Sequence, residues 1–356
     1  MAQPLLPDLL IEGYRGLRRL ELKKLGNVNL FVGQNGVGKT SVLEAVRLYS
    51  SQASIADLAD LLRDREEASD PDNWRNFESL FFNRSGSAPI QIGPRESLLR
   101  ISIQQTVQAV NDGILYYKFV DSDTGELAAR FPTLTVEQAG HRIRYAPQES
   151  GRPGGLHSQY IDLPGKQSNP PYTHVAAKGL EDAEFAKLWD RIVLTDYEEK
   201  LNRSLAQIVT SIQRVSLVQN GGGGGRRAMA KLRDADRPVP LRTLGDGIYR
   251  YIGIALALAN SKNGFLLIDE FENGLHYKTQ EALWKFVVQM ARELNVQVFA
   301  TTHDRDCIGA FGRAVAEDPE SEGILFRIEE FRGKIVETHF DESSILNIIE
   351  DLVEIR

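Results

Sequence analysis

Cysteine is nearly absent from this sequence, which has one such residue, Cys307, among 356. A single thiol excludes an internal disulfide and any zinc site built from several cysteines, and it is typical of a reducing compartment. A run of about 18 apolar residues, long enough to cross a membrane, is also missing. The N-terminal stretch MAQPLLPDLLIEGYRG lacks the basic start and long apolar core of a secretion signal. We therefore expect a cytoplasmic protein that does not span a membrane by itself.

An excess of positive charge is missing as well. The 42 Lys and Arg residues are outnumbered by 49 Asp and Glu residues, which gives a formal net charge of -7. That balance argues against a surface covered by basic patches for nucleic acid, although a local patch, and hence contact with DNA, stays open. The apolar share of 42% is typical of a globular protein, and the length allows two domains or one large elaborated domain.

A glycine-rich turn follows the last of three short strands expected between residues 8 and 32. The stretch GQNGVGKTSVLEAVRLYS begins at Gly33 and fits G-x-x-x-x-G-K-[ST], in which backbone N–H groups turn inward around phosphate oxygens. Lys39 would bring positive charge to the outer phosphates, and Thr40 a hydroxyl to Mg²⁺. A chance glycine turn is the alternative, and the position between strand and helix disfavours it. The residues expected to contact nucleotide here are Gly33, Asn35, Gly36, Gly38, Lys39, Thr40 and Ser41.

Two adjacent carboxylates follow an apolar strand in the second half of the chain, in FLLIDEFENGLH. Asp269 and Glu270 come directly after the apolar residues 265–268, where a pair of carboxylates is costly unless a cation sits nearby. Asp269 would hold Mg²⁺ through water, and Glu270 would orient or deprotonate an attacking water. An ordinary surface Asp-Glu pair is the alternative, and the phosphate loop in the same chain disfavours it.

A histidine follows a further apolar strand, VQVFATT, in which His303 comes directly after the last threonine. It would hydrogen-bond the γ-phosphate or the attacking water. A lone histidine after a strand is more often structural, so only its combination with the phosphate loop and the acid pair favours this role.

Two glycines open a long apolar helical pattern in RTLGDGIYRYIGIALALAN, residues 242–260. Gly245 and Gly247 let the backbone come close to a neighbour, and Asp246 can cap the first helical turn. A helix start with bare N–H groups is also a place for an anion. Taken alone, a loop that simply begins a helix is the simpler interpretation.

The remaining chain predicts an α/β fold. Strands and helices alternate from residue 264 onward, with a helix over 276–294, a hairpin near 324–340 and a final helix, which indicates a mainly parallel sheet with helices on both faces. Residues 180–216 carry apolar side chains at helical spacing and are expected as one or two helices. Residues 51–175 are expected as an insertion, mostly sheet and irregular chain with a charged helix at 54–69. NGGGGGRR is expected as a mobile surface loop.

Taken in order, GQNGVGKTS, LGDG, FLLIDE, ENGLH and TTH resemble the ATP-binding-cassette (ABC) type of ATPase head. The likeness is greatest to the branch that includes RecF, SMC proteins and the OLD-like ATPases of bacteria and phage-defence systems. It covers about residues 8–50 and 180–356. The resemblance implies a single P-loop NTPase head over 1–356, with nucleotide-binding parts at 8–50 and 240–310. It makes Lys39 and Thr40 Walker A residues, Asp269 and Glu270 the Walker B pair, and His303 the switch histidine, with ATP and Mg²⁺ as cofactors.

The resemblance also implies a homodimer. The LGDG helix of one subunit, with Gly245 and Gly247, would face the γ-phosphate held by the other and close an ATP sandwich twice over a two-fold axis. LGDG lacks the serine found at this place in transporters, and Asp246 must point away because its carboxylate would repel the phosphate. Only Gln52 is near enough to consider as a Q-loop glutamine, and nothing supports it.

These expectations favour a dimeric ATPase switch of OLD or RecF type, working on or near DNA and regulating a separate effector, such as a nuclease, in DNA-linked or anti-phage defence. A DNA-maintenance ATPase and a slow-turnover nucleotide-sensing scaffold are the alternatives. A transporter subunit is disfavoured by the missing serine and by the absence of a helical subdomain ahead of LGDG, and a small-molecule kinase would need neither LGDG nor ENGLH.

OLD-like enzymes usually carry a Toprim nuclease, whose chemistry needs a glutamate and a DxD cluster to hold Mg²⁺. The DxD candidates are residues 121–123 and 304–306. Both are expected as solvated turns rather than metal sites. We therefore expect any nuclease of this system to be another chain, docked on 51–175 or 180–216.

Overall fold

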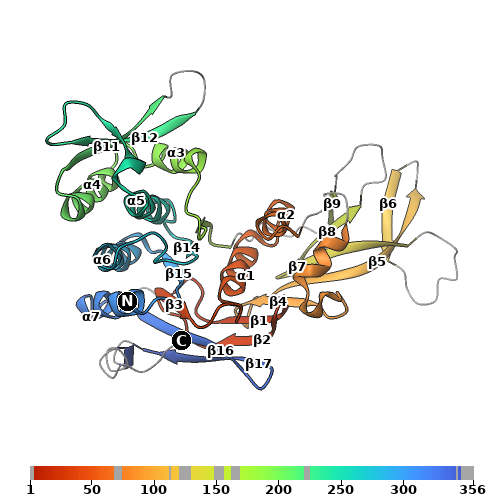
Figure 1. Ribbon diagram of the computed structural model, residues 1–356. Coiled ribbons are helices and arrows are strands. Elements are labelled where there is room, and N and C mark those ends of the chain that lie inside the picture. The colour runs from red at the N-terminus through yellow and green to blue at the C-terminus, as the bar shows by residue number, and fades with distance from the viewer. Residues whose placement is uncertain are drawn as a thin grey trace.

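The computed structural model describes residues 4–67, 74–111, 114–119, 130–147, 156–161, 169–219, 225–341 and 344–345. Helix α1 (Lys39–Ser51) lies between a mostly parallel sheet with its stack of helices and an antiparallel sheet (Figure 1). No helix within the described ranges is long and apolar enough to cross a membrane. The expected final helix, the glycine run at 221–224 and Asp121 with Asp123 lie outside the described residues.

The parallel sheet has six strands in the order β10-β14-β15-β3-β16-β17, and only the β16–β17 hairpin is antiparallel. The predicted mainly parallel sheet is therefore confirmed. Its strands are β3 (Val28–Val32), β10 (Tyr172–Val175), β14 (Phe265–Ile268), β15 (Gln297–Thr301), β16 (Gly323–Phe331) and β17 (Lys334–Phe340).

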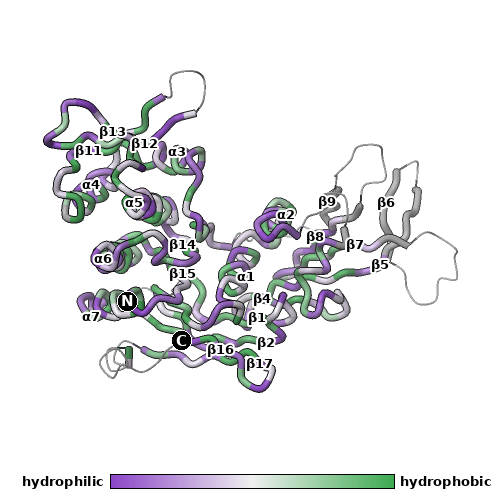
Figure 2. Tube along the Cα trace, in the orientation of Figure 1, coloured by the Kyte–Doolittle hydropathy of each residue, from purple (hydrophilic) through white to green (hydrophobic). Residues whose placement is uncertain are grey.

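Each face of this sheet is covered by helices, because the side chains of its apolar strands alternate between two cores. In β14, Leu266 and Ile268 join one core while Phe265 and Leu267 join the other. Figure 2 shows hydrophobic residues gathered in the central strands. The first core holds α3 (Asp182–Asp190), α4 (Asp196–Ile208), α5 (Asp246–Ala259), α6 (Tyr277–Leu294) and α7 (Arg305–Glu317); the second holds α1 and α2 (Ile55–Asp64).

The antiparallel sheet joins the first two strands of the chain to the segment expected as an insertion. Its order is β2-β1-β4-β5-β7-β8-β9, with β6 also paired to β5. Strands from residues 51–175 thus pair with β1 in one sheet, and the last residues of this segment form β10 of the parallel sheet. The strands are β1 (Leu9–Tyr14), β2 (Leu17–Leu22), β4 (Ile90–Gly93), β5 (Leu99–Asn111), β6 (Ile114–Phe119), β7 (Arg130–Gln138), β8 (His141–Pro147) and β9 (Leu156–Ile161).

The helical prediction for residues 180–216 is right for α3 and α4 and wrong after them. Residues from Ile212 onward form β11 (Ile212–Gln219), which pairs with β12 (Arg226–Leu232), itself paired with β13 (Val239–Pro240). A register shift near the start of β11 leaves buried Ile212 and Val215 three residues apart, which imitates helical spacing.

Candidate active site

The glycine-rich turn runs from the end of β3 into α1. Gly33, Gly36 and Gly38 have φ of 147°, 83° and 103°, a backbone region that favours glycine. A Cβ on Gly33 would lie 2.2 Å from the carbonyl oxygen of Ile328. The glycines are thus required by the path of the loop, which brings the chain to the N-terminus of α1, where backbone N–H groups can bind an anion.

Lys39 is the first residue of α1, and its side chain reaches back to this loop. Its Nζ donates hydrogen bonds to the carbonyl oxygens of Gly33 at 2.7 Å and Gln34 at 2.9 Å. Burial lowers the pKa of Lys39, against the opposing charges of Asp269, Glu272 and Glu270. The ammonium therefore sits between the loop and the carboxylates that follow β14.

The acid pair meets the first turn of α1. The Thr40 hydroxyl lies 3.2 Å from each carboxylate oxygen of Asp269, although 229 residues separate the two in sequence. Thr301 donates its hydroxyl to Asp269 Oδ1 at 2.6 Å and accepts the Glu270 N–H at 2.8 Å. A hydroxyl and a carboxylate side by side are hard oxygen ligands that suit Mg²⁺.

His303 lies beside the acid pair and is held by a residue that the sequence did not single out. Its Nδ1 is 3.0 Å from Glu272 Oε1, which also accepts the His303 N–H. Glu272 is buried, whereas the His303 imidazole is 53% exposed. Glu272 thus fixes the ring through Nδ1 and leaves Nε2 as the nitrogen that can meet a ligand.

The glycine-opened helix start differs from its expectation in one respect. Gly245, with φ of 106°, is the N-cap of α5, and the exposed Asp246 is the first helical residue and makes no capping bond. The predicted Asp246 cap is therefore wrong. A Cβ on Gly247 would lie 2.5 Å from the carbonyl oxygen of Gly274, so this glycine is required by packing against the ENGLH loop of the same chain.

Two other residues were candidates from the sequence. Gln52 lies away from the nucleotide loop, and Asp304 has a structural role. Gln52 ends α1, a helix of 13 residues, and so lies about 20 Å from the phosphate loop, with its amide on Gln138. Asp304 caps α7 by accepting the N–H groups of Asp306 and Cys307. Among the described residues no cluster of three or more His, Cys, Asp and Glu could hold a metal.

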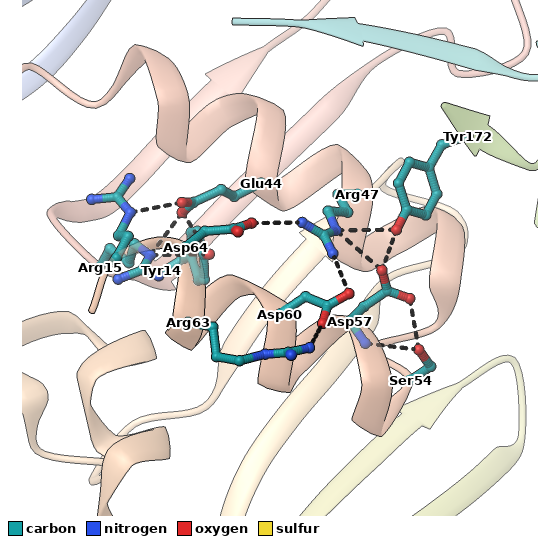
Figure 3. Close-up of polar contacts among 11 residues, drawn as sticks. Tyr14, Arg15, Glu44, Arg47, Ser54, Asp57, Asp60, Arg63, Asp64 and Tyr172 are labelled. Carbon is teal, nitrogen blue, oxygen red and sulfur yellow. Dashed lines mark hydrogen bonds and ion pairs between the residues drawn. The ribbon is translucent and has the colours of Figure 1, made fainter. Parts of the chain in front are cut away.

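A cleft of about 750 Å³ opens from Thr40 and Asp269 along α1, between α2 and the end of β10. Figure 3 shows the polar contacts along this side of α1. Arg47 contacts α2 through Asp57 at 3.1 Å and through two further aspartates, and it also donates to the Tyr172 hydroxyl. Burial and the charge of Arg47 lower the pKa of His174, which lines the cleft, to about 4, so its imidazole is neutral at pH 7.

Comparison with known proteins bears on this site. The family model described as "AAA domain, putative AbiEii toxin, Type IV TA system" matches residues 28–306. A Helicobacter pylori protein named ATP/GTP phosphatase is 21% identical over 346 residues, covering 86% of this chain and 87% of that protein. The DNA replication and repair protein RecF of Rickettsia bellii is 39% identical over 64 residues, 17% of this chain and 18% of that protein.

Among solved structures, the SMC head bound to the C-terminal winged-helix domain of ScpA has a similar fold. The TM-score is 0.50 at 13% identity, and the alignment covers 95% of this chain and 98% of that one. The predicted P-loop NTPase fold of the ABC-head type is thereby confirmed.

Proposed function

Because this chain belongs to the AAA-domain family, whose model matches residues 28–306, we propose that its phosphate loop and acid pair bind ATP with Mg²⁺ and hydrolyse it within a dimer. The chain is an ATPase of the ABC-head type, of the RecF-like and SMC-like kind. The observation that carries the assignment of residues is the meeting of Thr40 with Asp269 beside Lys39. In this proposal residues 1–356 act as one head.

The side chains divide the work of hydrolysis. Lys39 and the loop N–H groups would hold the phosphates, and Thr40 with Asp269 would hold Mg²⁺, which would supply positive charge against the phosphate oxygens. Glu270 takes a proton from water as the oxygen bonds to the γ-phosphorus and the bond to the bridging oxygen breaks, which releases ADP and phosphate. His303, oriented by Glu272 through Nδ1, presents Nε2 for a hydrogen bond with the γ-phosphate or the attacking water.

The dimer part of the proposal rests on the N-terminus of α5. Gly245 and Asp246 are exposed there, and Gly245 caps the helix without a side chain, so the first N–H groups and the positive end of the helix dipole face outward. A γ-phosphate held by a second copy of the chain would accept hydrogen bonds from these N–H groups. A two-fold dimer makes the contact twice and encloses two nucleotides.

The process that this ATPase switch would control is also a proposal. We infer that ATP-dependent closure regulates a separate effector, such as a nuclease, in DNA-linked or anti-phage defence. The description of the family names a "putative AbiEii toxin, Type IV TA system", and this name favours an effector system over DNA maintenance. The short match to RecF supports the alternative, a DNA-maintenance ATPase. A scaffold that binds ATP with little turnover is the third option, and it is separated from the others by the rate of hydrolysis.

The test is Glu270→Gln, with the exposed Glu330→Gln as a matched control. We expect Glu270→Gln to bind ATP normally and to lose about 100-fold or more in turnover, because the amide cannot take a proton. The closed dimer should also persist longer, which is measured as mass in solution with ATP. Unchanged turnover in Glu270→Gln would refute the role of Glu270, and a monomer under all conditions would refute the ATP sandwich.

A further inference from the structure

Arg250 on α5 is buried, with 6% of its surface exposed, and it reaches two loops at once. Its Nη1 donates to the carbonyl oxygens of Ala176 at 2.6 Å and Ala177 at 3.0 Å, in the loop after β10. Its Nη2 donates to the carbonyl oxygens of Asp269 at 2.7 Å and Glu270 at 2.8 Å. One guanidinium thus joins α5 to the loop after β10 and to the main chain of the acid pair after β14.

The partners of Arg250 are unusual for a buried arginine. Within the described part of the chain its hydrogen-bond partners are carbonyl oxygens alone, and its buried Nε has no hydrogen-bond acceptor. Burial lowers the pKa of Arg250 to about 10, against the charges of Glu272, Asp269 and Glu270, so it is still a cation at neutral pH. Burying a cation without a hydrogen-bonded carboxylate costs free energy. An apolar side chain would fill the same space at a lower cost, so packing alone does not explain an arginine here.

The bonds from Arg250 complete the restraint of the Glu270 backbone. Glu270 has φ of 49°, a left-handed conformation that is unfavourable for a residue with a side chain. Its N–H is held by Thr301, and its own carbonyl and the carbonyl before it are both held by Arg250. With the Phe271 N–H held by the Thr301 carbonyl oxygen, the main-chain polar groups next to the Glu270 Cα are all bonded, which fixes the direction of the Cα–Cβ bond that carries the carboxylate.

Arg250 also lies close to the helix start that faces outward. It is three residues after Gly247, within the first turns of α5. We propose that Arg250 is a positioning residue for hydrolysis: it transmits the placement of the α5 N-terminus against the nucleotide of the partner subunit to Glu270 of its own site. This inference rests on the proposed function, because it assigns a means of coupling between the two sites of the dimer.

The experiment compares Arg250→Lys, Glu270→Gln and the double variant, with the exposed Arg292→Lys as a control. Lysine keeps the charge but lacks the planar fork that spans two loops. We expect Arg250→Lys to lower kcat about 10-fold to 100-fold, as loss of a supporting bond does at other sites. KM and the affinity for a fluorescent ATP analogue should stay within about threefold, because Lys39 and the phosphate loop are untouched.

The double variant separates positioning from general packing. If Arg250 acts through Glu270, the double variant should turn over no more slowly than Glu270→Gln alone, because the group being positioned is already disabled. Multiplied losses in the double variant, or a loss of nucleotide affinity that matches the loss of kcat, would overturn the proposal. If Arg250→Lys does not fold, Arg250→Met fills the site without charge, and a folded Met variant with wild-type kcat would equally overturn it.

The outcomes are distinguishable from failure of the proposed function. Normal turnover in Glu270→Gln would remove the proposed function itself. A large loss in Glu270→Gln together with normal kcat in Arg250→Lys would leave that function standing and reject only the role of Arg250.

Discussion

Two arginines lie on helices that cover opposite faces of the parallel sheet, and they are equally buried, at 6% exposure each. Arg47 on α1 contacts Asp57, Asp60 and Asp64 of α2 (Figure 3). Arg250 on α5 contacts four carbonyl oxygens. Burial alone would lower the pKa of both, but Tyr172 and Asp57 raise that of Arg47, whereas that of Arg250 falls to about 10.

Arg47 and Arg250 show that two equally buried arginines can have different roles. The α1–α2 junction is an ion-paired contact, in which three aspartates of α2 surround Arg47 and hold α2 on the helix behind the phosphate loop. The carbonyl contacts of Arg250 instead restrain the main chain of Asp269 and Glu270, where small displacements alter the direction of a carboxylate. We therefore expect changes at Arg47 to act on stability and changes at the acid-pair side to act on turnover.

The largest effect is expected at Arg47. Arg47→Met leaves Asp57, whose side chain is 15% exposed, without its cation, and should lower the free energy of unfolding by about 3 kcal/mol. The kcat of the folded variant should stay near wild type. Denaturant unfolding measures the first and steady-state kinetics the second. Arg63→Met is the control, because the Arg63 side chain is 70% exposed and the change should be within about 0.5 kcal/mol. A stable Arg47→Met with lost turnover would erase the distinction between the two arginines.

The next effect is expected on the acid-pair side, at Thr301. Thr301→Val keeps the shape but removes the hydroxyl that bonds Asp269 and the Glu270 N–H, so kcat should fall about tenfold. Stability should change by only about 1 kcal/mol. Thr338→Val, on the exposed surface of β17, is the control for kinetics and thermal unfolding. If the loss in free energy of unfolding exceeds the rise in activation free energy that corresponds to the loss of kcat, Thr301 acts mainly on stability, as Arg47 does. It then differs from Arg250, which is expected to act on turnover.

The smallest effect is expected at Asp57 and depends on pH. Burial opposes ionisation of Asp57, but hydrogen bonds from Ser54 and Tyr172 and the charge of Arg47 outweigh it and hold its pKa below the ordinary value. A lowered folded pKa stabilises the fold above the unfolded pKa of about 4, and this contribution is lost as pH falls through the folded value.

Asp57→Asn should therefore be less stable than wild type by about 1 kcal/mol near pH 7. The gap should close as pH falls below about 4. Unfolding followed from pH 7 to pH 3 measures it. A gap that stays constant over this range would show that the carboxylate charge does not stabilise the α1–α2 junction.

Local sequence patterns were sufficient where one segment makes the feature. The loop from Gly33 to Thr40 was predictable because its glycines permit a backbone path between a strand and a helix, and the acid pair because it ends an apolar strand. The same local reasoning failed at β11, where an irregular register spaced Ile212 and Val215 as in a helix. It also failed at Asp246, because a cap depends on where the side chain turns and not on its type alone.

Glu272 and Thr301 were within reach of sequence reasoning, since both lie in the stretches ENGLH and TTH that carried the resemblance. Their roles as partners of His303 and Asp269 appear only from contacts across the strand ends. The division of the chain was less accessible. No local sequence feature distinguishes β1 and β2 from β3, yet β3 lies in a different sheet. Which sheet a strand joins depends on partner strands that are distant in the sequence.

By itself, the sequence determined that a phosphate loop, an acid pair, a switch-type histidine and a glycine-opened helix occur in one chain, because each is a short pattern with its own backbone or charge requirement. Tertiary structure alone decided that Thr40 meets Asp269 across 229 residues and that Arg250 holds the main chain of Glu270. The physical reason is that the acceptors of Arg250 are backbone carbonyls. Every residue carries one, so residue identity cannot reveal which four will converge on a guanidinium.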